Sequence, residues 1–163
     1  MSKVVLQSSD LPKAFSIFYF GHELMADQTG PRSDITRFDR VGGWVGRYHR
    51  SGSPKTVGPL VISSKADLFK NADGAKKDFE LYRQQLFQAG GAKEVDPGEL
   101  GDEAAAVTTL QQGAVNVRNY AIAWREANAT AELELNGFEG KLTLADALTL
   151  ARKQERRLRD AAR

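Results

Sequence analysis

Residues that could carry out chemistry are few in this chain of 163 residues, and their spacing matches no catalytic motif. His22, Glu23 and His49 would supply three metal ligands, but no HExxH or comparable zinc spacing is present. The chain also lacks a G-x-S-x-G nucleophile turn and a G-x-x-x-x-G-K-[ST] phosphate loop. It has no cysteine, which excludes disulfides, thiolate metal sites and a cysteine nucleophile. We therefore predict no enzymatic activity, no catalytic residue, no metal site and no cofactor.

Asp102 and Glu103 are adjacent carboxylates just before an expected strand. Because neighbouring side chains on a strand point to opposite faces, the two cannot act together as acid and base. We expect Asp102 to accept amide hydrogen bonds within its turn. A hydrolase of unrecognised type, using carboxylates or His49, is the alternative hypothesis.

The residues best suited to binding are aromatic and arginine side chains on the expected strands. Apolar walls with a few charged groups are the usual form of a small-molecule site, and Trp44 and Trp124 could form such walls with arginines at the rim. The candidate ligand-binding residues are Trp44, Arg47, Tyr48, Arg118, Trp124 and Arg125. In the alternative interpretation the aromatic residues are core residues. Arg125 then stacks on its neighbour or pairs with Glu132 or Glu134 on the next strand.

Alternation with a period of two predicts the strands that would position these side chains. Trp44, Gly46 and Tyr48 would share one face of a sheet, and the glycine in this row would let the backbone or an aromatic ring approach closely. The segment 92–101 is expected to be a loop. The expected strands are 14–20, 41–50, 59–68, 104–110, 116–126 and 129–135.

The segment 129–135 is the clearest one-sided strand of the chain. Its polar residues are Thr130, Glu132 and Glu134, and they alternate with Ala129, Ala131, Leu133 and Leu135. We expect Asn136-Gly137 to close it.

Two further segments have apolar residues at helical spacings of three and four. The first follows Asn71 and ends at a Gly-Gly pair, since glycine adopts the left-handed conformation that closes helices. The second follows Thr143, which forms a capping-box pattern with Asp146. Glu155 interrupts the second stripe, so we expect the last turns to project beyond the core. The stripes are Ala75, Phe79, Tyr82, Leu86 and Ala89, and then Leu144, Leu148, Ala151, Leu158 and Ala162.

The element order is strands, helix, three antiparallel strands, helix. Hairpin-linked strands with helices between them favour the α+β class over a parallel doubly wound sheet. No internal repeat or linker divides the chain, so we predict one domain over 1–163 in which helices pack on an antiparallel sheet.

Composition limits the classes of partner. Hydrophobic residues make up 41% and charged residues 27% of the chain, and no apolar run approaches the roughly 20 residues that span a bilayer. The net charge of +2 is too small to favour a nucleic-acid partner. Residues 151–163 are more basic, with six basic and two acidic side chains. A cytosolic protein that binds partners through this basic helix is therefore a further alternative.

Three stretches together resemble small secreted bacterial proteins of the PsbP-like α/β/α sandwich type. That group includes photosystem extrinsic proteins, bacterial lipoproteins and sensor domains of actinobacterial kinases. The stretches are Ser9-Asp10-Leu11-Pro12, Gly42-Gly43-Trp44-Val45-Gly46-Arg47-Tyr48, and Leu100-Gly101-Asp102-Glu103-Ala104 with Trp124-Arg125 and the helix Leu150 to Leu158. The resemblance implies an antiparallel sheet with helices on both sides and a location outside the cytoplasm. It implies no activity, because the group has adaptor, assembly and sensing roles.

The leading hypothesis is a non-catalytic, extracytoplasmic binding or assembly module for a protein or small-molecule ligand. The chain would be secreted, or held by a membrane tether outside this segment. No signal peptide is visible at the start of the sequence, so a cytoplasmic location is the alternative.

Overall fold

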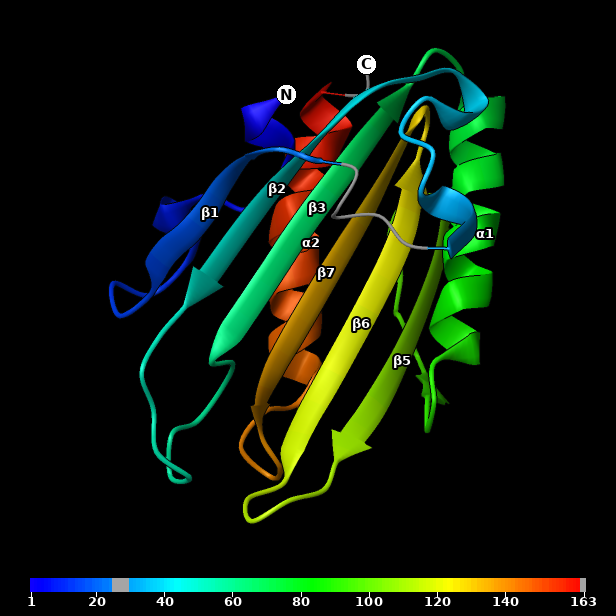
Figure 1. The fold of residues 1–163 in the computed structure, drawn as a ribbon. Helices are drawn as coiled ribbons and strands as arrows, with labels where there is room; N and C mark the ends of the chain where they lie inside the picture. The colour runs from blue at the N-terminus through cyan, green and yellow to red at the C-terminus, as the bar shows by residue number, and fades with distance from the viewer. Residues whose placement is uncertain (25–29, 162–163) are drawn as a thin grey trace.

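A seven-stranded antiparallel sheet with a long helix on each face forms the centre of the molecule (Figure 1). This computed structural model describes residues 1–24 and 30–161. The strand order is β1-β2-β3-β7-β6-β5-β4, so the last long strand of the chain lies in the middle of the sheet. The elements are β1 (Ser16–His22), β2 (Arg40–His49), β3 (Val61–Phe69), α1 (Ala72–Gln88), β4 (Lys93–Val95), β5 (Glu103–Gln111), β6 (Val117–Glu126), β7 (Ala129–Phe138) and α2 (Leu144–Ala161).

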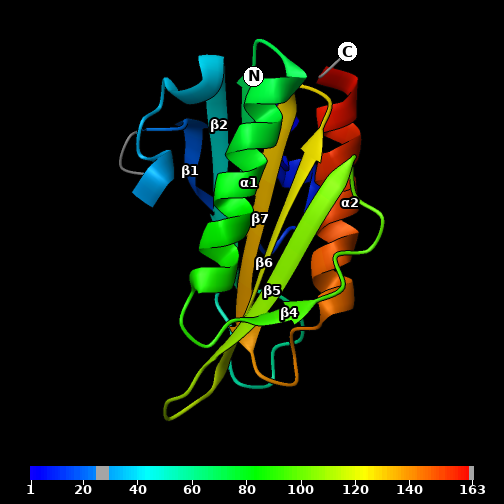
Figure 2. The same ribbon diagram turned by 90° about the vertical axis from the view of Figure 1, so that its right-hand side faces the viewer.

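The two faces of the sheet are covered by different elements, as Figure 2 shows. On one face, α2 packs on β6 and β7, and the N-terminal segment with the short turn η1 (Ser2–Val4) lies beside it. On the other face, α1 packs on β6, β7, β3 and β5. Two short turns of the β1–β2 connection, η4 (Gly30–Arg32) and η5 (Arg37–Asp39), also contact α1. These arrangements confirm the predicted α+β class.

The α2 face of the sheet is the apolar core. Ile62, Ile122, Leu133 and Trp124 are fully buried there, and Leu158 of α2 packs in the same cluster. The residues of the N-terminal segment that close this core are Val4, Val5 and Leu6. Burial of such large side chains stabilises the fold by about 1.5–3 kcal/mol each.

Polar side chains fix the N-terminal segment in place on this core. The Leu6 amide donates to Ser64 Oγ at 3.0 Å, and the Tyr48 hydroxyl donates to the Leu6 carbonyl at 2.6 Å. The Ser64 hydroxyl in turn donates to the Gln154 side chain of α2 at 2.8 Å. These bonds pair polar groups that would otherwise be buried without partners.

Helix α1 forms where the sequence predicted it. Asn71 caps its first turn by accepting a hydrogen bond from the Gly74 amide at 2.9 Å. Gly74 also brings the helix close to η5, because a Cβ atom at this position would lie 2.3 Å from the Phe38 carbonyl oxygen. The buried side of α1 consists of Phe79, Tyr82 and Leu86 packed on Ala105, Val107 and Ala123.

The prediction that a glycine lets an aromatic ring approach the backbone closely is confirmed at Gly46. A Cβ atom on Gly46 would lie 3.1 Å from the Tyr48 ring and 3.3 Å from Phe20. The capping box before α2 is confirmed as well, because the Thr143 amide donates to Asp146 and the Asp146 amide donates to the Thr143 hydroxyl.

Several expectations about the elements were wrong. The segment 92–101 contains the short strand β4, which pairs with β5. Strand β7 runs through Asn136-Gly137 to Phe138, because β6 and β3 pair with it on both sides. Glu155 does not break the contact of α2 with the core: it is buried and accepts a hydrogen bond from the Gly101 amide at 2.7 Å. Ala162, expected in the α2 stripe, lies outside the described residues.

Strand β7 is not one-sided. Its apolar row faces α2, but Thr130 and Glu132 on the opposite row are also buried, under α1 and the β1–β2 connection. Within the described residues, neither long helix has the length and apolar character that a membrane crossing requires.

The difference in burial predicts that replacing Trp124 costs much more stability than replacing Trp44. We expect Trp124→Ala to lower the free energy of unfolding by about 3–5 kcal/mol, because Trp124 is fully buried and a cavity would remain. Trp44→Ala, at a half-buried position on the same face, is the matched control and should cost less. Urea unfolding followed by circular dichroism measures both. Equal losses would contradict this assignment of the core.

Candidate functional site

The two tryptophans of the predicted site lie on one face of the sheet but do not form a pocket. They belong to a single cross-strand row, Trp44–Ala66–Ala131–Trp124, which faces α2. Trp124 is fully buried in the core, and Trp44 packs against Phe20 and His22 with ring centroids 5.7 and 4.5 Å away. The row therefore has the geometry of the core-packing alternative.

The other four predicted residues lie apart from one another. Tyr48 is buried beneath the N-terminal segment, and Arg47 lies over the Tyr19 ring on the opposite face. The structure places Arg118 beside Glu139 and Arg125 beside Asp102 and Glu103. The expected pairing of Arg125 with Glu132 or Glu134 is thus wrong, because the residue facing Arg125 on β7 is Thr130. None of the six predicted residues lines either of the two cavities described below.

The other chemical candidates have local partners. Asp102 accepts a hydrogen bond at 2.9 Å from the Ala127 amide in the turn between β6 and β7, rather than from an amide of its own turn as predicted. The ring of His49 packs against Phe18. Among the side chains of residues 1–24 and 30–161, no group of three or more metal-ligating residues is arranged to hold an ion.

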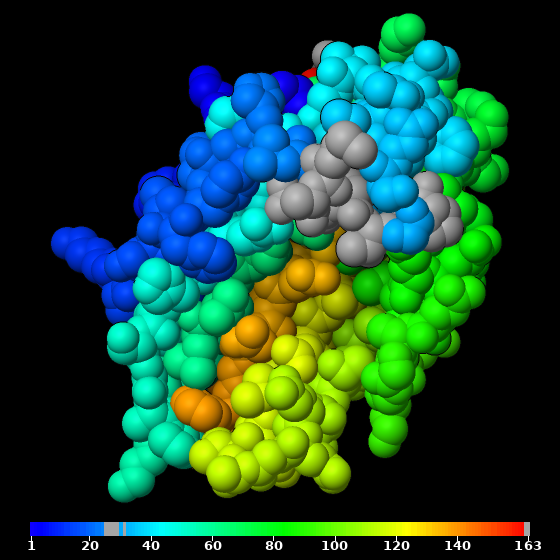
Figure 3. All heavy atoms as spheres, in the orientation of Figure 1, coloured from blue at the N-terminus to red at the C-terminus, as the bar shows by residue number. Residues whose placement is uncertain are grey.

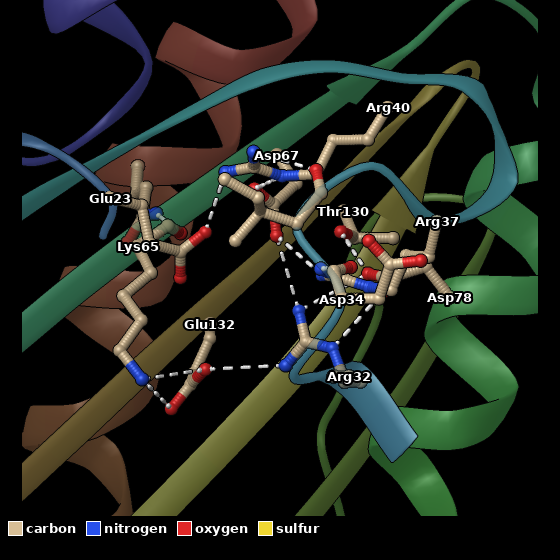
Figure 4. A network of polar contacts seen from close by, with 12 residues as sticks. Glu23, Arg32, Asp34, Arg37, Arg40, Lys65, Asp67, Asp78, Thr130 and Glu132 are labelled. Carbon is tan, nitrogen blue, oxygen red and sulfur yellow. Dashed lines mark hydrogen bonds and ion pairs between the residues drawn. The ribbon is translucent and has the colours of Figure 1, made fainter. Parts of the chain in front are cut away.

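Buried charged residues gather on the α1 face, where the β1–β2 connection crosses the sheet (Figure 4). We call them the charge cluster, and it consists of Glu23, Arg32, Arg37, Arg40, Lys65, Asp67, Asp78 and Glu132. Arg32 and Arg37 come from the connection and Arg40 begins β2, whereas Lys65, Asp67 and Glu132 come from β3 and β7 and Asp78 comes from α1. The cluster thus joins four segments that are far apart in the sequence.

Asp78 is the most deeply buried member of the charge cluster. It accepts hydrogen bonds from Arg32 at 3.0 and 3.1 Å, from Arg37 at 2.6 Å and from the Thr130 hydroxyl at 2.8 Å. Burial alone would raise the pKa of Asp78, but the two arginines outweigh burial and lower it. Asp78 therefore stays ionised and holds the connection against α1.

A second set of contacts surrounds Asp67. Its carboxylate binds Arg32 and Arg37 at 3.2 and 3.1 Å and also Arg40, which reaches on to Glu23 at 2.8 Å. Burial, followed by the charge of Asp67, raises the pKa of Glu23 to about 8. Burial and the neighbouring Asp67 together therefore outweigh the charge of Arg40 at Glu23.

The other end of the charge cluster opens into a hollow in the surface. Lys65 binds Glu132 at 3.2 Å, and Arg32 lies 3.8 Å from the same carboxylate. Figure 3 shows the surface hollowed over β7 and β6, between β3 on one side and α1 on the other. The cavity has a volume of about 430 Å³, which suits a small molecule.

The hollow combines a polar floor with a partly apolar wall. Its floor is made by the sheet, and α1 supplies one wall. The polar lining residues are Arg32, Ser63, Lys65, Tyr82, Gln85, Thr109, Asn119, Tyr120, Glu132, Glu134 and Asn136, and the apolar ones are Val61, Leu86, Ala89, Val107, Ala121 and Leu135. Apolar walls with a few converging polar groups are typical of ligand sites.

Two glutamates of β7 lie side by side at this floor with opposite pKa shifts. Burial would raise the pKa of Glu132, but Lys65 and Arg32 outweigh burial and lower it. The charge of Glu132, followed by burial, raises the pKa of Glu134 to about 8. Glu134 is open to the hollow, whereas Glu132 is only 3% exposed. At neutral pH, Glu132 is therefore a carboxylate and most of Glu134 is a carboxylic acid.

Two buried hydroxyl groups at the hollow differ in their surroundings. The Ser63 Oγ makes no hydrogen bond among the described residues. The Tyr82 hydroxyl lies against the Glu132 carboxylate and helps to lower the pKa of Glu132. Because buried hydroxyls are usually paired, the Ser63 hydroxyl is the one left for a ligand or for water.

A second cavity of about 320 Å³ lies on the opposite face, next to α2. Its charged groups are already paired: Lys153 donates to the Asp10 carbonyl at 2.7 Å, and Arg157 holds the Asp10 carboxylate at 2.8 and 2.9 Å. Arg159 binds Glu155 and Glu126 in the same way. Much of the basic charge of α2 is therefore used within the molecule.

Sequence reasoning missed the site on the α1 face. Glu132 and Glu134 stand two residues apart, a spacing that puts both on one face of a strand. That signal was visible, but their row was taken as a solvated face. Recognising the site needed the strand order, which places β7 between β3 and β6.

The fold and the hollow together describe an α+β domain in which an antiparallel sheet lies between helices and has a polar cavity on one face. Among solved structures, the chain is similar to the extracellular domain of PknH from Mycobacterium tuberculosis. The TM-score is 0.67, and the match covers 99% of this chain and 94% of that one at 12% sequence identity. At this identity the similarity shows the fold alone.

No protein-family model matches the chain, and no curated protein matches its sequence. The predicted resemblance included sensor domains of actinobacterial kinases, and the similarity to PknH agrees with that part in fold. The PsbP-like assignment itself is not confirmed.

The charge cluster predicts a strong effect of neutralising its central carboxylate. We expect Asp78→Asn to lower the free energy of unfolding by about 3–5 kcal/mol at pH 7, because two buried arginines lose a partner. The control is Asp73→Asn on the exposed side of α1, which should cost less than about 1 kcal/mol. Since folding lowers the pKa of Asp78, the wild type loses this advantage as the pH falls below 3.8. Urea unfolding at pH 7 and pH 3 measures the effect, and a loss that did not depend on pH would contradict it.

For Glu134 we predict that the free energy of unfolding depends on pH in the opposite direction to that for Asp78. Because folding raises the pKa of Glu134 from 4.5 to about 8, the folded state binds a proton that the unfolded chain releases, and stability falls as the pH rises through this window. Glu134→Gln should therefore stabilise the protein at pH 9 and change little at pH 4. Urea unfolding at both values tests this. Glu80→Gln on the exposed side of α1 is the control, and an equal gain at pH 4 and 9 would overturn the interpretation.

Proposed function

We propose that this chain is a non-catalytic binding module that acts outside the cytoplasm and takes a small polar ligand in the hollow on the α1 face. The observation that carries the proposal is the hollow itself, which combines an accessible Glu134, the unpartnered hydroxyl of Ser63 and an apolar wall. The location outside the cytoplasm is supported by the similarity in fold to an extracellular domain. The absence of cysteine is compatible with it and decides nothing.

The charge cluster supports binding because it makes the upper edge of the hollow rigid. Arg32 and Lys65 are held by carboxylates from three elements, so the groups that face a ligand keep their positions without it. Preorganised polar groups lose little conformational freedom when a ligand binds. A mobile polar surface would lack this advantage.

A hydrolase is the second candidate, and the glutamate pair is the observation that favours it. Two carboxyl groups with pKa values moved apart can serve as base and acid. However, Glu132 is buried and bound to Lys65, so it cannot reach a substrate bond directly. Binding without turnover fits this geometry better.

The proposal predicts that small molecules bind in one place. A chemically diverse fragment library, screened by NMR on the ¹⁵N-labelled chain, should shift amide signals of Ser63, Asn119 and Asn136 together. Ala89→Trp, at the exposed rim of the hollow, should weaken these shifts, because the added ring narrows the cavity. Gln88→Trp is the matched control on the same turn, outside the lining, and should leave them unchanged.

Two results would contradict the proposal. Shifts that scatter over the surface, or no shifts at all, would remove the hollow as a binding site. Chemical conversion of a bound fragment during the experiment would favour the hydrolase instead.

A further inference from the structure

Glu134 lies in the middle of the floor of the hollow. In the register of the sheet it faces Ser63 on β3 and Ala121 on β6, so its nearest cross-strand neighbours are small. Glu132, two residues earlier on the same face, lies beside Lys65 in that register. Glu134 is therefore exposed at the hollow, with its carboxyl group hydrogen-bonded to that of Glu132, which is covered.

Glu134 has no ion-pair partner among the described residues, because the nearby cations bind other carboxylates. Lys65 and Arg32 bind Glu132, and Arg32 is further held by Asp78 and Asp67. Among the described residues, Glu134 makes no ion pair of its own.

All the elements packed around Glu134 contribute to its state. From β7 comes the negative charge of Glu132, and from β3 and β2 come the positive charges of Lys65 and Arg47, which oppose the shift without cancelling it. The remaining titratable neighbours at the hollow are Tyr82 of α1 and Arg32 of η4. At neutral pH most of Glu134 is therefore protonated, and a cationic group of a ligand could take the place of this proton.

The rest of the lining would accept and donate hydrogen bonds. Ser63 provides an unpartnered hydroxyl, and Asn119 and Asn136 provide amides. Leu86 and Val107 provide an apolar surface between these groups. A fitting ligand therefore has a cationic end, an apolar body and hydroxyl groups.

We infer that the hollow binds small molecules that carry a protonated primary amine and at least one hydroxyl group, with the ammonium on Glu134. This inference rests on the proposed function of the hollow and names its ligand class. A primary ammonium suits the site because it donates charge-assisted hydrogen bonds to a carboxylate. An anionic ligand fits poorly, since it would approach Glu132 and Glu134 while Lys65 and Arg32 already have carboxylate partners.

Binding of the ammonium must displace the proton from Glu134. With a pKa of about 8 for Glu134, close to one proton is released for each ligand bound at pH 7. The affinity should rise about tenfold from pH 7 to pH 9, because the carboxylate form grows over this range. An alkyl amine keeps its charge there, since its pKa is similar to that of lysine, about 10.4.

The test compares three probes of the same length by isothermal titration calorimetry. They are 6-amino-1-hexanol, its neutral analogue 1,6-hexanediol, and the anion 6-hydroxyhexanoate. We expect the amine to bind at least tenfold more tightly than either analogue at pH 9, to lose about tenfold in affinity at pH 7, and to release a proton there. Proton release is measured from the dependence of the heat on the ionisation enthalpy of the buffer.

Two variants assign the effect to one carboxyl group. Glu134→Gln should lower the affinity for the amine at least tenfold at pH 9 and abolish proton release. Glu80→Gln, on the exposed side of α1 and outside the hollow, should keep both. Unchanged binding and proton release in Glu134→Gln would overturn the inference.

The outcomes separate the inference from the proposed function. Tighter binding of the diol or the anion than of the amine overturns the inference but leaves the hollow as a ligand site. No binding of any probe, with fragments still bound at Ser63 and Asn119, likewise overturns the inference alone. No binding of probes or fragments overturns both.

Discussion

The burial of Asp67 and Asp78 between the sheet and α1 is the constraint on which the rest of the α1 face depends. A carboxylate removed from water is costly unless cations and hydrogen-bond donors replace the solvent. Here the donors are Arg32 and Arg37 of the β1–β2 connection and Arg40, which follows the connection at the start of β2. The buried charge therefore determines where the connection crosses the sheet, and the connection in turn forms the upper edge of the hollow.

The two faces of the sheet differ in character: one holds the apolar core, and the other holds the charge cluster and the hollow. On the α2 face the side chains are large, apolar and fully buried, and the N-terminal segment closes the remaining gap. On the α1 face the residues near α1 are small, such as Ala105 and Ala123, and the floor beyond them is polar and open. A cavity with converging polar groups is possible on this face because the other face supplies most of the apolar burial.

Much of the fold follows from local patterns in the sequence. The period-two alternation located the six long strands, and the caps at Asn71 and Thr143 located both helices, because these signals act over a few residues. Strand β4 was missed because its three residues are too short to show a period. The candidate site was missed because it depends on long-range pairing: Glu132 meets Lys65 only when β7 inserts beside β3. The proposed role of Trp44 and Trp124 came from residue type alone, and type does not distinguish a core aromatic residue from one that lines a pocket.

The boundary between covered and open surface falls within a single strand. Along one row of β7, Thr130 and Glu132 are buried by the charge cluster, whereas Glu134 and Asn136 line the open hollow. Two chemically identical side chains therefore differ in charge at neutral pH, because Lys65 and Arg32 outweigh burial at Glu132, whereas the charge of Glu132 and burial outweigh the cations at Glu134. The fold shared with the PknH domain at 12% identity fixes the positions of such a row but not its residues. The chemical character of the hollow is consequently determined by the side chains that this sequence places beyond the end of the charge cluster.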